Sequence, residues 1–154
     1  MVDECEMVER PARPTMAVRL RVPAQDMTLP LADAFGAVRQ CLNELGEEPV
    51  GPAYVAYPSM GRQNLDVEMG FPVARPLRNK GGVKASEIPA GKYATCLHAG
   101  PYGGIDAAYA ALSRWLAANG QQTTGAAYEM LLTDPLTTPA PAMEIQILLR
   151  LKEG

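Results

Sequence analysis

Two segments decide the fold: residues 31–46, LADAFGAVRQCLNELG, and residues 105–120, IDAAYAALSRWLAANG. In each segment apolar residues recur at alternating spacings of four and three, and a glycine follows the last of them. That spacing places the apolar side chains on one face of an α-helix, and a glycine just past the end is a common stop signal. The sequence therefore predicts two amphipathic helices, with stripes formed by Leu31, Phe35, Val38, Leu42 and Leu45, and by Ile105, Tyr109, Leu112 and Leu116.

The two helices superpose at an offset of 74 residues, and the agreement extends beyond them. At this offset Gly125 aligns with Gly51, and Tyr128 with Tyr54. After a two-residue length difference, 143–147 aligns with 67–71; upstream, 87–90 resembles 9–12. Agreement through helix, stop and two strands indicates an internal duplication.

Each half is predicted to contain two strands, a helix and two further strands. Because a half of fewer than about 80 residues buries little core alone, both halves should join in a single domain, 1–154, with a first half 1–75, a linker 76–82 and a second half 83–154. The expected fold is α+β: duplicated β-α-β-β halves with pseudo-twofold symmetry, an antiparallel sheet with two helices on one face, and a ligand cleft between the halves. The predicted strands are 3–10, 15–22, 50–57, 65–73, 83–88, 92–98, 125–132 and 142–151.

Composition excludes several classes of function. A net charge of -3 and a pI of about 5.2 argue against a nucleic-acid-binding surface. The acidic start, residues 1–6, predicts no secretory signal, and no apolar run approaches the roughly 20 residues of a membrane span, so we expect a cytoplasmic protein. Three separated cysteines and one histidine give no disulfide framework and no multi-histidine zinc site. We find no phosphate or dinucleotide fingerprint and expect neither cofactor nor metal.

Strand alternation assigns side chains to the two faces of the sheet. The uniformly apolar rows should pack beneath the helices, whereas Glu68 shares the opposite row, which faces solvent or the cleft. In strand 125–132 both rows are apolar except for Glu129. A carboxylate in an apolar wall must have a raised pKa, a protein cation or a cationic ligand as compensation. Glu129 is therefore either a pocket carboxylate or an edge residue that reaches solvent. The rows assigned to the helices are Met143, Ile145, Ile147, Leu149 and Leu151, and Val67, Met69, Phe71 and Val73.

Aromatic residues and the histidine supply further candidates. Tyr57 lies on the cleft-side row, and Tyr102 lies in the loop that enters the second helix, so both are candidate ligand contacts. Trp115 is either a core residue or a ligand platform, and His98 is either a hydrogen-bonded structural histidine or a base. Tyr109 belongs to the helix stripe and is assigned to the core.

The motifs HAGPY at 98–102, Trp115-Leu116, and GAAYE at 125–129 with Asp134-Pro135 together resemble the GyrI-like small-molecule-binding domain, which is also the effector-binding module of multidrug-responsive transcription activators. Residues 66–73, DVEMGFPV, also resemble the family's first-half strand. The resemblance implies a cleft on the pseudo-twofold axis with Glu129 as its central carboxylate. Many members carry a tyrosine two residues after that glutamate; here Leu131 takes its place, while Tyr57 occupies the matching site of the first half.

Two functions compete. The first is stand-alone binding of a lipophilic, aromatic or cationic xenobiotic, in sequestration or sensing, through Glu129, Tyr57, Tyr102, Glu68, Leu131, Trp115 and His98. The alternative, implied by proteins similar to this family, is hydrolysis of the cyclopropane of DNA-alkylating natural products, with Glu129 as general base or acid and Tyr57 or Tyr102 assisting. We expect a small-molecule ligand, no nucleic acid or membrane partner, and a monomer or homodimer. A protein-interaction role is a third hypothesis that no residue specifies.

Overall fold

The computed structural model describes residues 5–23, 28–57, 64–134 and 137–152. In these ranges the helices are α1 (Thr28–Leu45) and α2 (Ile105–Ala118), with short 3-10 turns η2 (Tyr102–Gly104) and η3 (Ala140–Ala142). The α+β class and both predicted helices are confirmed. The strands are β1 (Glu6–Arg10), β2 (Arg13–Pro23), β3 (Ala53–Tyr57), β4 (Asn64–Pro72), β5 (Lys84–Ile88), β6 (Gly91–Ala99), β7 (Thr123–Leu131) and β8 (Glu144–Leu151).

All eight strands form one antiparallel sheet in the order β1-β6-β8-β7-β3-β4-β2-β5. The central pair is β3 and β7, and equivalent strands of the two predicted halves follow it outward on either side. Two pairings are not what the boundaries of the predicted halves suggest. β1, at the start of the first half, pairs with β6, and β5, at the start of the second, pairs with β2. The first strand of each predicted half thus pairs with a strand of the other predicted half.

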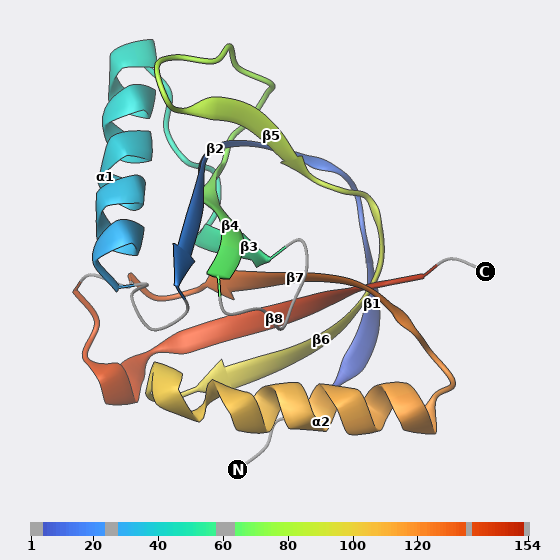
Figure 1. Cartoon of the computed structure of the whole chain (residues 1–154). Helices are drawn as coiled ribbons and strands as arrows, with labels where there is room; N and C mark the ends of the chain where they lie inside the picture. Colours follow the sequence, from blue (N-terminus) through green and yellow to red (C-terminus); the bar gives the residue numbers. More distant parts are fainter. Residues whose placement is uncertain (1–4, 24–27, 58–63, 135–136, 153–154) are drawn as a thin grey trace.

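Both helices cover the same face of the curled sheet, as predicted. Figure 1 shows α1 and α2 along different margins of the sheet, and β3 and β7 run between them. α1 packs on β2 and β4, and α2 packs on β6. The apolar rows assigned to the helices lie in one core cluster with the helix-stripe residues whose side chains the structure describes, which excludes Leu31. Burial of each large apolar side chain contributes about 1.5–3 kcal/mol. The buried helix residues of this cluster include Phe35, Val38 and Leu42, and Ile105, Ala108 and Leu112.

A second, smaller cluster covers the other face of the sheet. It contains three tyrosines, Tyr54, Tyr93 and Tyr128, of which the first two are fully buried. Tyr93 and Tyr128 meet edge to face, with ring centroids 6.0 Å apart. Both faces of the central strands are therefore covered, as the two apolar rows of β7 predicted.

The cysteines act as packing residues. Cys41 and Cys96 are buried, Cys5 is half-buried, and all three are free thiols. Within the described ranges, neither helix combines the length and apolar character needed to cross a membrane.

Candidate functional site

Glu129 lies at the centre of the sheet, on the face that carries the helices. It stands in β7 opposite Val55 of β3 on one side and Ile147 of β8 on the other. Glu129 is only 2 % exposed to solvent. The pleat of β7 places Glu129 in the same row as Ala127 and Leu131, so the carboxylate emerges from an apolar wall. Glu129 is therefore buried and does not reach solvent at an edge, and its role as a pocket carboxylate stays a prediction.

Tyr57 reaches the same carboxylate from the neighbouring strand. It is the last residue of β3 and pairs with Ala127, one same-face position from Glu129. Its hydroxyl lies 3.5 Å from Glu129 Oε1, a long hydrogen bond. The two residues come from β3 and β7, which are distant in sequence and neighbours in the sheet.

Tyr109 reaches the other carboxylate oxygen from above the sheet. It lies in α2, is half-buried, and donates its hydroxyl to Glu129 Oε2 at 2.5 Å. The sequence assigned Tyr109 to the helix core, and its ring does pack against the core cluster. The missed signal was the hydroxyl itself, because a tyrosine in an apolar stripe needs a polar partner.

These three side chains bring one buried carboxyl group together with two phenol hydroxyls. The Tyr57 hydroxyl faces one oxygen of Glu129 and the Tyr109 hydroxyl faces the other. Such a centre can hold a cationic group beside aromatic rings. It can also exchange a proton with a water or a bound molecule through a carboxylate and a phenol.

The other predicted site residues lie in different parts of the fold. Leu131 lies in the same row as Glu129, is buried, and pairs with Ala53. Trp115 is half-buried and packs against the core cluster from α2. His98 Nε2 lies 2.8 Å from the carbonyl oxygen of Pro101, where it ties down the loop that enters α2. The side chain of Tyr102 lies outside the described residues.

Glu68 is not brought to Glu129. It pairs with Ala56, on the opposite face of the sheet from Val55 and Glu129. There it is 5 % exposed, and its oxygens lie 2.8 Å from the Tyr54 hydroxyl, 2.9 and 3.0 Å from Ser86 Oγ, and 3.3 Å from Arg19 Nε. Burial, and then the neighbouring Glu68, raise the pKa of Tyr54. Glu68 therefore belongs to a separate polar cluster that joins β2, β3, β4 and β5.

A family model identifies the class of domain to which the chain belongs. The chain belongs to the GyrI-like small molecule binding domain family, whose model matches residues 3–152. No curated protein sequence matches the chain significantly.

Solved structures share the fold. EcmrR in complex with DNA is 21 % identical, with a TM-score of 0.83; the match covers 98 % of this chain and 58 % of that one, so this chain spans little more than half of EcmrR. The EcmrR C-terminal domain alone is 19 % identical, with a TM-score of 0.78, and both chains are fully covered.

Two further solved structures share the fold at lower sequence identity. A hydrolase from Listeria innocua is 13 % identical, with a TM-score of 0.71, covering 97 % of this chain and 92 % of that one. SAV2435 bound to tetraphenylphosphonium is 7 % identical, with a TM-score of 0.64, covering 97 % and 94 %. At these identities the likeness concerns the fold alone.

Proposed function

We propose that this protein binds lipophilic aromatic cations at a site centred on Glu129, in sequestration or sensing of toxic compounds. The observation that carries the proposal is the position of the carboxylate. It is buried in the central strand pair, and tyrosine hydroxyls from β3 and α2 face its two oxygens.

The physical reasoning concerns hydration. A carboxylate that is already removed from water and held by hydrogen bonds does not have to be desolvated when a ligand arrives. A small cation such as sodium would lose strong hydration on entering an apolar wall. A bulky cation, with its charge spread over aromatic groups, loses little and gains apolar contact. The rings of Tyr57 and Tyr109 add cation–π attraction.

The relatives support the same chemistry. SAV2435 was solved bound to tetraphenylphosphonium, a lipophilic aromatic cation, and EcmrR was solved bound to DNA. The family to which this chain belongs is defined by small-molecule binding. A role in sensing or sequestration is therefore proposed here for the chain as a ligand-binding unit.

Titration with tetraphenylphosphonium, followed by calorimetry, tests the proposal. We expect binding to the wild type and a loss of about tenfold or more in Glu129→Gln, because one charge-assisted contact contributes about 1.5–3 kcal/mol. Triphenylphosphine oxide, a neutral analogue, should bind both proteins equally.

The chain offers a matched control in Glu68→Gln. It makes the same isosteric change at a buried carboxylate, on the other face of the sheet. This variant should bind the cation like the wild type. If folded Glu129→Gln, verified by circular dichroism, kept the wild-type affinity, the proposal would be wrong.

A second candidate function is hydrolysis of a strained ring, and the contact between Tyr109 and Glu129 favours it. Glu129 could take a proton from water as the water oxygen bonds to a cyclopropane carbon. As the ring C–C bond breaks, its electron pair stays on the other ring carbon, which takes a proton from the phenol of Tyr57 or Tyr109. The proton on Glu129 then passes to that phenolate and restores both groups. The likeness to a hydrolase from Listeria innocua supports this candidate at the level of fold.

Incubation with a cyclopropane-bearing DNA-alkylating natural product separates the two functions. Turnover would give a product heavier by one water, seen by mass spectrometry above the uncatalysed background. We expect Glu129→Gln to abolish it and Glu68→Gln to retain it. Binding without a hydrated product would leave the binding function alone.

A further inference from the structure

A separate pocket lies beside α1, at the other end of the central strand pair from Tyr57. Its volume is about 220 Å³. Its lining includes Ala53 and Leu131, which pair across β3 and β7. Neither Glu129 nor the two tyrosines that contact it line this pocket, although Leu131, which follows Glu129 in the same row, does.

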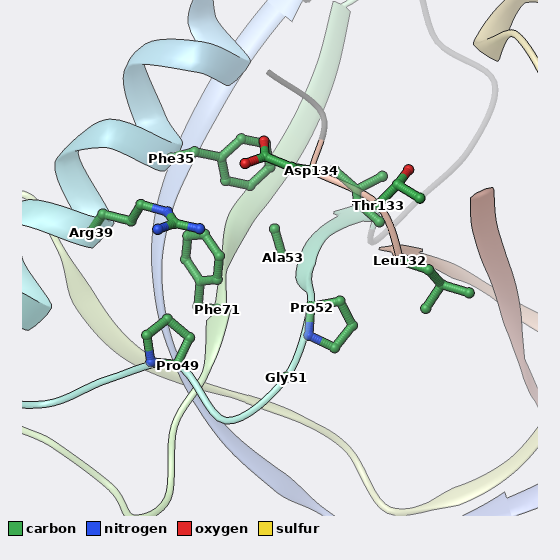
Figure 2. A pocket seen from close by; sticks show the side chains of 11 residues that line it. Phe35, Arg39, Pro49, Gly51, Pro52, Ala53, Phe71, Leu132, Thr133 and Asp134 are labelled. Atoms are coloured by element: carbon green, nitrogen blue, oxygen red, sulfur yellow. The ribbon is translucent and has the colours of Figure 1, made fainter. Parts of the chain in front are cut away.

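The wall formed by α1 and β4 combines aromatic rings with a guanidinium group. Phe35 and Phe71 meet edge to face with centroids 5.9 Å apart, and both are buried. The guanidinium carbon of Arg39 lies 5.1 Å from the centroid of the Phe71 ring. Figure 2 shows Arg39 reaching from α1 to this ring, and Pro49 lies below it. Arg39 itself is exposed, so its N–H groups remain accessible at the rim.

The remaining lining comes from the other side of the central strand pair. It is formed by the end of β7 and the residues after it, Leu132, Thr133 and Asp134, together with Pro52 of the loop before β3. The guanidinium of Arg39 therefore favours the negative end of a bound molecule on the α1 side of the pocket.

We propose that this pocket binds a small aromatic carboxylate. The ring lies against Phe71 and the proline walls, and the carboxylate accepts hydrogen bonds from Arg39. Stacking on Phe71 orients the planar guanidinium, and a guanidinium pairs with a carboxylate through two parallel hydrogen bonds. A cavity of about 150 Å³ holds benzene, so a pocket of this size takes one or two fused rings.

Binding of 2-naphthoate, measured by calorimetry and by amide shifts in nuclear magnetic resonance spectra, tests this proposal. We expect shifts at Leu131, Leu132 and Thr133. Arg39→Gln should weaken binding about tenfold, since a hydrogen bond to a charged group contributes about 1.5–3 kcal/mol. Arg39 is exposed, so the variant should remain folded.

Three controls sharpen the result. Arg114→Gln removes an exposed arginine from α2 and should leave the binding of 2-naphthoate unchanged. Glu129→Gln should also leave it unchanged, and this result would distinguish the pocket from the cation site. The amide 2-naphthamide should bind the wild type about tenfold more weakly than the acid. Equal losses in Arg39→Gln and Arg114→Gln, equal binding of the amide, or an absence of shifts at the pocket would overturn the proposal.

Discussion

Replacement of Tyr54 by phenylalanine should destabilise the protein through one hydrogen bond to a buried charge. Tyr54 is fully buried, and its hydroxyl lies 2.8 Å from both Glu68 Oε2 and Thr15 Oγ1. A carboxylate can only accept, so the phenol proton goes to Glu68 and Thr15 supplies the second bond. Tyr54→Phe removes the phenol from both contacts and keeps the ring.

The expected loss follows from the kind of acceptor. A hydrogen bond to a charged group contributes about 1.5–3 kcal/mol, and a bond between neutral groups about 1 kcal/mol. Tyr93 provides the comparison, because it is equally buried on the same face and donates to a neutral acceptor, the carbonyl oxygen of Pro89. We expect Tyr54→Phe to cost about 2–3 kcal/mol and Tyr93→Phe to cost about 1 kcal/mol.

Urea unfolding, followed by far-ultraviolet circular dichroism, measures both variants under the same conditions. A shift in the midpoint with an unchanged slope indicates a change in stability. A smaller loss for Tyr54→Phe than for Tyr93→Phe would refute the argument that the Glu68 cluster holds a charge.

Two further predictions concern alkaline pH and the glycines. Burial raises the pKa of Tyr93 to about 12. Its contribution to stability is therefore complete below the unfolded pKa of about 10 and is lost as the pH rises through about 12. Across this window the urea midpoint should fall less steeply in Tyr93→Phe than in the wild type. Gly70→Ala would place a Cβ against the carbonyl oxygen of Met16 and should lower the free energy of unfolding by about 3 kcal/mol or more. Gly36 is exposed in α1 with nothing within 4 Å of an added Cβ, so Gly36→Ala should raise the free energy of unfolding by about 1 kcal/mol. Thermal unfolding that ranks the two variants in the other order contradicts the packing argument.

The elements and their faces could be read from local pattern. The stripes of residues 31–45 and 105–116 predicted both helices, and alternation in the strands predicted which rows would lie beneath them. These features depend on neighbours three, four or two positions away, so short-range sequence contains them. The same logic singled out Glu129, because one carboxylate interrupts two apolar rows.

Pairings between distant segments could not be read in this way. The exchange of β1 and β5 depends on strand edges that meet only when the sheet is complete, and the sequence carries no local signal for it. Tyr109 looked like a stripe residue because its helix pattern records burial and not the hydroxyl's partner. Glu68 was assigned to the solvent- or cleft-facing row, but register with Ala56 places it across the sheet from Glu129. Periodicity sets the face that a side chain occupies, whereas long-range register and helix placement set which side chains meet.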